Sequence, residues 1–265
     1  MNSLPRALFI SHGGGPMPLL GDLGHREMVA CLKDLAARMP LPEAIVVVSA
    51  HWEASVPTIT AAAQPDLIYD YHGFPPESYE ITYPCPGEPA LAQTLKEMLV
   101  AAGIEARLDA ARGLDHGVFV PLRIMYSQAT IPCVQLSLVD TLDPAEHIAI
   151  GRALAGLSAR NVLVIGSGFS FHNLKAFFAP PSEEGDRLNQ AFESWLAEVC
   201  CSETCTEAER AERLIHWAEA PGARFCHPRE EHLLPLHVCY GVAGAACTER
   251  VALRIMDKAS SLYVW

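Results

Sequence analysis

Residues 7–16 read ALFISHGGGP, an apolar run that ends at a histidine and three glycines. The apolar part is typical of a buried strand, and the glycines allow the backbone to turn sharply directly after it. Residues 44–51 read AIVVVSAH and again end at a histidine, and VLVI at 162–165 is followed by GSGFSFH, which ends at His172. Three separate predicted strands are therefore each followed by a histidine.

Helical patterns alternate with these strands. Apolar residues recur at helical spacing or in helix-like runs at 26–39, 90–102, 120–127, 143–159, 186–199, 207–219 and 231–246. Further strands are expected at 132–138, 251–256 and 261–264. Continuously apolar strands that alternate with helices predict an α/β fold with a central, mostly parallel or mixed sheet covered by helices on both faces. With no repeat and no linker, one domain over residues 1–265 is expected.

The histidines at the strand ends are the main functional signal. In an open α/β sheet, ligands bind beyond the carboxyl ends of the strands. Histidine is the commonest metal ligand and the usual proton shuttle near neutral pH. The shared position of His12 and His51 favours a metal site at this edge of the sheet, whereas the pattern alone leaves His172 balanced between catalysis and a structural role.

Other histidines are weaker candidates. His116 lies in a glycine-flanked turn, GLDHGVFVPL, where it could also simply cap the turn. His232, in CHPREEHLLPL, is expected in the first turn of an apolar helix. His227 is five residues away and does not share a helix face with it, so at most one of the two is expected to be a ligand. The histidines on predicted helices are interpreted as solvated or packed residues: His25, His147, His216 and His237.

One long segment resists the alternating pattern. Residues 64–89 read QPDLIYDYHGFPPESYEITYPCPGEP, with six prolines and four tyrosines. A loop of this length inside a compact domain is usually functional, often as a lid or pocket wall. Tyr69, Tyr71, His72 and Phe74 are the candidate wall residues; a surface excursion with a short hairpin at 79–82 is the alternative.

Composition narrows the function classes. The net charge is −12 and only 19% of residues are charged, so an acidic globular protein without affinity for nucleic acid or anionic lipid is expected. No apolar run is long enough to span a bilayer, and the first residues lack a signal-peptide core, so a cytoplasmic location is expected. Nine cysteines argue against a disulfide framework, and the thiols of VCCSETC (199–205) are expected to be reduced.

The motifs together resemble a known family. SHGGGP, SAHWE, YDYHGFP, TYPCPG, GLDHGVFVPL, GSGFSFHNL and HPREEHLLPL occur in this order over about residues 6–245 and resemble the class III extradiol ring-cleavage dioxygenases, in particular the DOPA 4,5-dioxygenase type. The resemblance implies one non-haem divalent metal at the carboxyl edge of the sheet, with Fe²⁺ for ring cleavage. It also implies a small-molecule catechol and O₂ as substrates.

The resemblance further implies residue roles. His12 and His51 match two metal ligands, and His232 matches the third, where the wider superfamily has a carboxylate; Glu231 stands beside it. Three neutral imidazoles also suit Zn²⁺. His172 matches a base outside the metal ligands, and His116 matches a residue near the substrate oxygens. The pocket residues that the resemblance and the loop suggest are His227, Tyr71 and His72.

Two other functions stay open at this stage. A zinc hydrolase on the same fold would use a metal-bound water, and a homologue without catalysis would act in metal binding or signalling. Five motif histidines argue against the second. The sequence does not identify the catechol, and it shows no obvious clamp for a carboxylate. Arg112 and Arg229 lie near motif histidines but are interpreted as surface residues.

Overall fold

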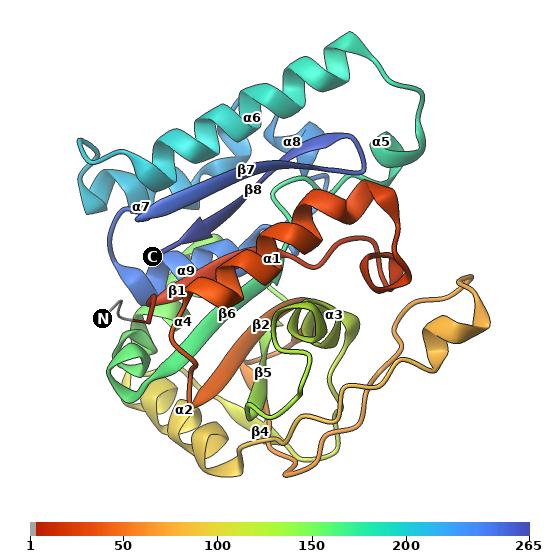
Figure 1. Ribbon diagram of the computed structural model, residues 1–265. Helices are drawn as coiled ribbons and strands as arrows, with labels where there is room; N and C mark the ends of the chain where they lie inside the picture. The colour runs from red at the N-terminus through yellow and green to blue at the C-terminus, as the bar shows by residue number, and fades with distance from the viewer. Residues whose placement is uncertain (1–3) are drawn as a thin grey trace.

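The computed structural model describes residues 4–265 and arranges them around one eight-stranded mixed sheet (Figure 1). The strand order is β4-β3-β5-β2-β6-β1-β8-β7. The four central strands are parallel to one another: β1 (Ala7–Ser11), β2 (Ala44–Ala54), β5 (Cys133–Val139) and β6 (Val162–Gly168). β8 (Lys258–Val264) is antiparallel to β1, and β7 (Glu249–Ile255) is antiparallel to β8.

The other edge of the sheet holds two short strands. β3 (Thr58–Thr60) pairs antiparallel with β5, and β4 (Arg107–Asp109) pairs parallel with β3. The sequence analysis did not predict them because three residues are too few to show an alternating pattern. The predicted mostly parallel or mixed sheet is confirmed, and it carries the predicted strands in the parallel centre and in the closing hairpin.

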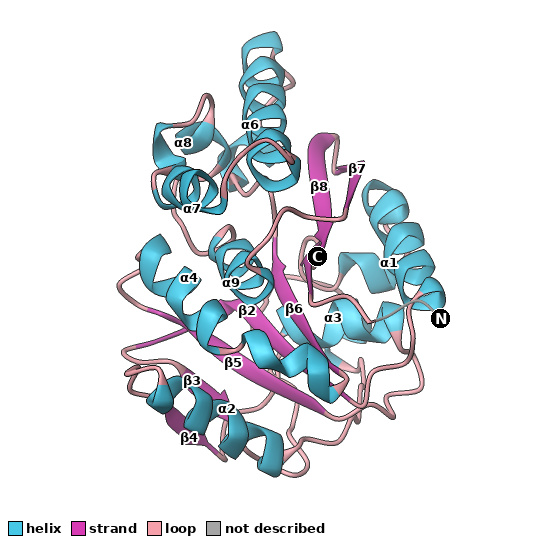
Figure 2. Ribbon diagram, turned by 90° about the vertical axis from the view of Figure 1, so that its left-hand side faces the viewer, coloured by secondary structure: helices cyan, strands magenta, loops and turns pink. Residues whose placement is uncertain are grey.

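Helices cover both faces of the sheet (Figure 2). α1 (Arg26–Arg38) and α3 (His116–Met125) lie on one face, and α2 (Pro89–Ala101), α4 (Pro144–Ala153) and α9 (Leu234–Ala243) lie on the other. Between β6 and α9 the chain forms α5 (Leu174–Phe178), α6 (Glu183–Cys201), α7 (Glu207–Ile215) and α8 (Ala223–Cys226), and α6 packs against the β7–β8 hairpin. Short 3-10 turns occur at Met17–Leu20, Leu23–His25, Pro76–Tyr79, Ala155–Arg160 and Trp217–Glu219.

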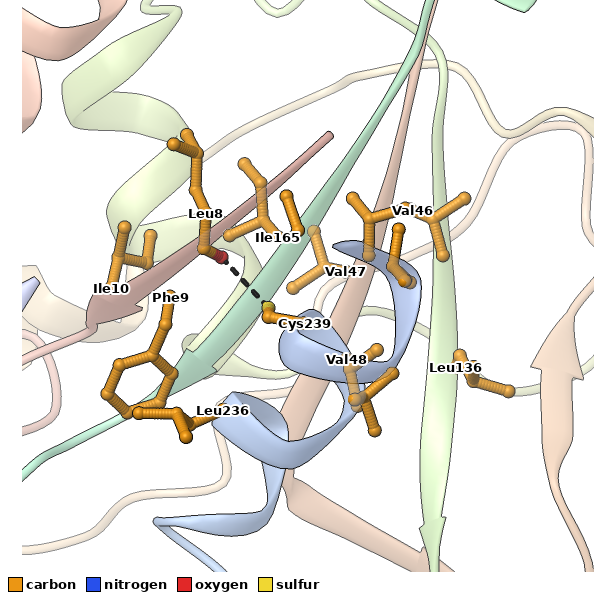
Figure 3. Packing of buried hydrophobic residues seen from close by; sticks show 14 of the residues in the cluster. Leu8, Phe9, Ile10, Val46, Val47, Val48, Leu136, Ile165, Leu236 and Cys239 are labelled. Atoms are coloured by element: carbon orange, nitrogen blue, oxygen red, sulfur yellow. Dashed lines mark hydrogen bonds between the residues drawn. The ribbon is translucent and has the colours of Figure 1, made fainter. Parts of the chain in front are cut away.

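The core between α9 and the sheet fixes the position of the site. Leu236 and Cys239 of α9 pack on Leu8 and Phe9 of β1 and on the valines of β2, all fully or almost fully buried (Figure 3). The Sγ of Cys239 also donates to the carbonyl oxygen of Leu8 at 3.2 Å. Burying one such aliphatic side chain contributes about 1.5–3 kcal/mol. This packing holds the chain before α9 against the carboxyl ends of the strands.

Several predicted boundaries shift. Asp143 caps α4 by accepting hydrogen bonds from the backbone N–H groups of Ala145 and Glu146, but the α-helix ends at Ala153 and a 3-10 turn continues to Arg160. α3 begins at His116 rather than at residue 120, and α9 begins at Leu234, so His232 precedes the helix. No strand pairing is found at 79–82. Tyr79 ends the 3-10 turn that begins at Pro76, and the next three residues are irregular.

The prediction of reduced thiols is wrong for one cysteine. Cys201, at the end of α6, forms a disulfide with Cys247, which lies between α9 and β7. The two α-carbons are 5.0 Å apart, and the N–H of Cys247 donates to the carbonyl of Cys200 at 2.8 Å. The sequence could not reveal the pair because the folded chain brings together residues separated by 46 positions. Within residues 4–265, no helix has the length and apolar character needed to cross a bilayer.

Candidate metal centre

His12 and His51 meet at the carboxyl ends of two parallel strands. His12 directly follows β1, and His51 lies in β2, where the pairing with β5 shifts register between Val48 and Glu53. Such an irregularity re-aims side chains near the end of a strand. The two Nε2 atoms are 3.0 Å apart, so both rings point into the same space.

Three further histidines surround this pair. The ring of His232 lies 5.3 Å from that of His12 and 5.0 Å from that of His51, measured between centroids. The ring of His116 lies 4.0 Å from that of His51, and His172 stacks on His232 at 3.3 Å. All five line one cavity of about 340 Å³, a volume typical of small-molecule sites. The structure therefore brings together all five motif histidines.

A proline in α3 helps to orient His12. Pro121 has no N–H, so the carbonyl of Gly117, four residues earlier, lacks its helical donor. The hydroxyl of Ser167 donates to this carbonyl instead, and its oxygen lies 3.1 Å from Nδ1 of His12. Because Ser167 has only one proton to give, Nδ1 of His12 must be the donor in that contact. The lone pair of its Nε2 therefore faces the cavity.

His232 is oriented by its neighbour in the chain. Its Nδ1 lies 2.9 Å from Oε1 of Glu231, and because a carboxylate only accepts, Nδ1 carries the proton. Its Nε2 is buried and has no hydrogen-bond partner among the described residues. The carbonyl of His232 accepts from the N–H of Phe169, an approach that only a glycine at 168 permits, since a Cβ there would collide with that carbonyl.

His116 is held by Asp70, a residue that the sequence analysis missed. Asp70 Oδ1 accepts from Nδ1 of His116 at 2.8 Å and from its backbone N–H at 2.9 Å, and Oδ2 lies 3.7 Å from Nδ1 of His51. Burial raises the pKa of Asp70, but the hydrogen bonds from His116 outweigh it and keep the pKa below the ordinary range. The signal was its position in YDYH beside two candidate wall residues.

A second carboxylate, that of the fully buried Asp115, supports the backbone at His51. Asp115 accepts from the hydroxyl of Ser49 at 2.7 Å and from the side-chain amide of Gln135. The hydroxyl oxygen of Ser49 in turn accepts the backbone N–H of His51 at 3.2 Å. The hydrogen bond from this network to His51 is made by the backbone N–H, so the network fixes the main chain of His51 and leaves its ring nitrogens free of it.

The electrostatics favour neutral imidazoles. Burial, with a smaller repulsion from the neighbouring histidines, lowers the pKa of His12 and His51 well below the ordinary range. Burial likewise lowers the pKa of His232 to about 3. A neutral imidazole is the form that binds metal, so at neutral pH these three rings are in the form that a metal ion would bind.

The donor set fits one divalent ion. The Nε2 of His12 carries a lone pair, and the Nε2 of His51 lies 3.0 Å from it, so a cation at this point would be within reach of both nitrogens. Two nitrogens bound to one ion at about 2.1 Å are about 3 Å apart at a right angle and about 3.4 Å apart at the tetrahedral angle. The donor atoms of His12, His51 and His116 lie within 4.8 Å of one another, as do those of His172, Glu231 and His232. By this distance His116 completes a set of three with His12 and His51. His232 is the other candidate, because its ring lies 5.3 Å from that of His12 and 5.0 Å from that of His51.

The remaining candidates are placed differently. Tyr71 and His72 line the cavity, but the hydroxyl of Tyr71 donates to the carbonyl of Ser78 at 2.6 Å, so Tyr71 offers its ring and not its hydroxyl. His227 does not line the cavity. Its ring is fully buried between Phe192 and Trp217, and its Nε2 lies 2.8 Å from the carbonyl oxygen of Ser170. The expectation that His227 contacts substrate is therefore wrong, because the turn after α8 directs it into the core.

His25 contributes to the site from outside it. Gly13 has a φ of 80°, which favours glycine, and the next residue, Gly14, donates its N–H to Nε2 of His25 at 2.9 Å. Asp22 fixes the other nitrogen at 2.7 Å. The sequence analysis interpreted His25 only as a solvated or packed residue; its buried ring also holds the glycine turn that follows His12.

The sequence and the fold of this chain are similar to those of known proteins. A family model described as the catalytic LigB subunit of aromatic ring-opening dioxygenase matches residues 24–260. The chain belongs to this family. Its relatives include dioxygenase tasH of Hapsidospora irregularis, 41% identical over 91% of this chain and 78% of that protein, and a 4,5-DOPA dioxygenase extradiol of Beta vulgaris, 36% identical over 92% and 88%.

A solved structure shares the fold seen here. It is an uncharacterized protein from Escherichia coli K12, with a TM-score of 0.74 and 30% identity over 97% of this chain and 98% of that one. The resemblance to the extradiol dioxygenases is thereby confirmed at the level of the family.

Proposed function

We propose that this protein is an extradiol dioxygenase that opens a catechol ring beside its two hydroxyl groups, with O₂ as co-substrate. One divalent metal ion held by His12, His51 and His232 would serve as cofactor. The observation that carries the proposal is the buried Nε2 of His232, which has no hydrogen-bond partner among the described residues and belongs to a ring facing the close pair His12 and His51. Burying a polar nitrogen without a partner is costly, and a metal ion supplies the partner.

The choice of His232 over His116 rests on what each ring already binds. Both have an Nδ1 fixed by a carboxylate, Glu231 for His232 and Asp70 for His116. Only the Nε2 of His232 is both fully buried and unpaired among the described residues. His116 begins α3 at the cavity wall, where it is suited to contact a substrate oxygen.

The protein would control the protons of the reaction. When bound, an Fe²⁺ ion would bind the diol and O₂ and pass electrons between them, so that both oxygen atoms enter the ring-opened product. His172 lines the cavity, and its Nδ1 lies 3.5 Å from Glu231 Oε1. It would take a proton from a catechol hydroxyl and later return it, which a histidine can do near neutral pH. His116, held by Asp70, would donate to a substrate oxygen.

Oxygen uptake tests the proposal directly. The purified protein is loaded with Fe²⁺ without air, then mixed with air and a panel of catechols that includes DOPA. One O₂ consumed per catechol, with a yellow ring-opened product, is expected. No uptake from any catechol while Fe²⁺ is demonstrably bound would overturn it. His172→Ala is expected to keep the metal and lose turnover.

A zinc hydrolase is the second candidate. The all-histidine donor set favours it, because three neutral imidazoles are a common Zn²⁺ site in which a bound water is activated. Hydrolysis of an ester or amide by the Zn²⁺-loaded protein without oxygen consumption would support this alternative.

A further inference from the structure

The cavity that holds the histidines has a second, apolar part. Its members come from four separate segments: the turn after β1, the 64–89 loop, α5 and the β7–β8 turn. They are Met17, Phe74, Leu174, Phe177, Phe178 and Met256, here called the apolar rim. A Cβ added to Gly14 would meet the sulfurs of Met17 and Met256 at 3.4 and 3.5 Å. The rim therefore begins directly beside the glycine turn that follows His12.

The α5 segment holds its apolar side chains in place. Asn173 caps the helix by accepting from the N–H of Ala176 at 3.1 Å, and its amide donates to the carbonyl of Phe225 at 2.7 Å. The ring of Phe177 packs on those of Phe169 and Phe171, at 5.7 and 5.2 Å between centroids. α5 is thus anchored on its inner side by packing and by hydrogen bonds at its first turn.

Two rim residues are left in water by this arrangement. Leu174 is 59% exposed and Phe178 is 80% exposed. Both line the cavity that contains the histidines. A ligand that covers them removes apolar surface from water, which is favourable in proportion to the area covered. The mouth of the cavity therefore favours an apolar group on the part of the substrate that extends away from the histidines.

No basic side chain serves this cavity within residues 4–265, because none of the residues that line it there is lysine or arginine. Among the same described residues, the one carboxylate that lines it is that of Asp70. Arg112 is turned elsewhere: its guanidinium stacks on Trp52 at 4.4 Å and contacts Asp115 at 3.3 Å. An anionic substituent would lose water here and meet Asp70 without a cation to pair with, which is unfavourable.

The other nearby cations are also engaged away from the cavity. Arg229 binds the carboxylate of Glu53 with both terminal nitrogens, one of them at 2.7 Å. Lys175 follows Leu174 in the chain, yet it lines a different hollow on the surface together with Lys258. Neither Arg112 nor Arg229 provides a clamp for a carboxylate. The interpretation as a surface residue holds for Arg229, whose side chain is 52% exposed, but is wrong for Arg112, whose side chain is only 23% exposed because it packs against Trp52 and Asp115.

From these observations we infer that the site selects catechols whose ring substituent is uncharged and apolar, an alkyl or aryl group or an ester. It disfavours catechols with a carboxylate or an amino-acid side chain. This inference rests on the proposed function, because it assumes that the diol lies at the histidines. It then follows that the reaction supplying the substrate yields a neutral, hydrophobic catechol.

Two probes of nearly equal shape isolate the charge. They are 3-(3,4-dihydroxyphenyl)propanoate and its methyl ester. Their affinities are measured by calorimetric titration of the Fe²⁺-loaded protein without oxygen, where no turnover occurs, and their kcat/KM by oxygen uptake in air. The ester is expected to be preferred about tenfold or more in both measurements, because it makes apolar contacts with the rim whereas the carboxylate of the acid loses water without gaining a cation.

Variants of the rim test where the preference arises. Phe178→Ala is expected to lower the affinity for the ester about threefold to tenfold and to change the affinity for the acid by no more than about twofold. Leu174→Lys supplies the missing cation and is expected to raise the affinity for the acid about threefold to fivefold. Leu41→Lys is the matched control, because Leu41 is a similarly exposed leucine, 68% in water, outside the cavity.

The outcomes separate the inference from the proposed function. An acid that binds as well as the ester, or a preference that Leu174→Lys and Leu41→Lys change equally, overturns the inference. Absence of oxygen uptake with both probes and with every catechol of the panel, while Fe²⁺ is bound, overturns the proposed function. The affinities measured without oxygen then test the apolar rim by the same preference for the ester over the acid. A tenfold preference for the ester that falls in Leu174→Lys and not in Leu41→Lys supports the inference.

Discussion

Replacing Glu231 by glutamine tests whether this carboxylate acts through His232 or binds the metal itself. Its Oε1 lies 2.9 Å from Nδ1 of His232 and 3.5 Å from Nδ1 of His172, so it faces the sides of both rings that bear Nδ1. These contacts place Glu231 behind the proposed ligand. Glutamine keeps an oxygen that can accept the Nδ1 proton of His232 but removes the negative charge.

The expected loss follows from this hydrogen bond. A bond to a charged group contributes about 1.5–3 kcal/mol and a neutral one about 0.5–1.5 kcal/mol. Glu231→Gln therefore weakens the support of His232 by about 1–1.5 kcal/mol, or about fivefold to twelvefold in metal affinity. Glu231→Ala removes the support altogether, and a loss of about 10–100-fold is typical for such partners of a ligand.

The assay is a Zn²⁺ competition with a fluorescent chelator, started from metal-free protein. Glu230→Gln is the matched control: it changes the neighbouring residue, whose carboxylate pairs with Arg224 at 2.7 Å outside the cavity. The expected order of affinity is wild type and Glu230→Gln first, then Glu231→Gln, then Glu231→Ala. A Glu231→Gln protein that holds no metal would show that Glu231 is itself a ligand, and unchanged affinity in both Glu231 variants would refute its role.

Three further predictions follow from the geometry. His232→Ala is expected to lose tight metal binding whereas His116→Ala keeps one ion per chain, measured by metal analysis after dialysis; the reverse result would make His116 the third ligand. Ser167→Ala frees Nδ1 of His12 and is expected to weaken Zn²⁺ binding about 10–100-fold, whereas Ser194→Ala on the exposed side of α6 leaves it unchanged. The metal-free protein is expected to lose stability below pH 6.5, because burial lowers the pKa values of His12, His51, His147 and His232 and the unfolded chain takes up protons first. Each of these four costs about 1.4 kcal/mol per pH unit down to its folded pKa. Urea denaturation at pH 7.5 and 5.5 checks this, and equal free energies of unfolding at the two values would contradict it.

The sequence by itself determined the sheet and the edge where the site lies. His12, His51 and His172 each follow an apolar run, and parallel strands end at the same edge, so their proximity could be predicted without knowing the strand order. The motifs around His116 and His232 added the other two histidines through the family resemblance. The helix from Asp143 was predictable for a local reason, because a cap needs only the next three residues.

Only the tertiary structure decided how those histidines are held and what surrounds them. His12 is held by Ser167, whose hydroxyl binds the Gly117 carbonyl that lacks a helical donor. His116 is held by Asp70, which lies 46 positions earlier in the chain. His227 lies in a motif too, yet packing against Phe192 and Trp217 removes it from the cavity. The disulfide between Cys201 and Cys247 likewise joins residues that are remote in the chain. Hydrogen bonds and packing depend on distances between segments remote in the chain, and local sequence patterns do not contain those distances.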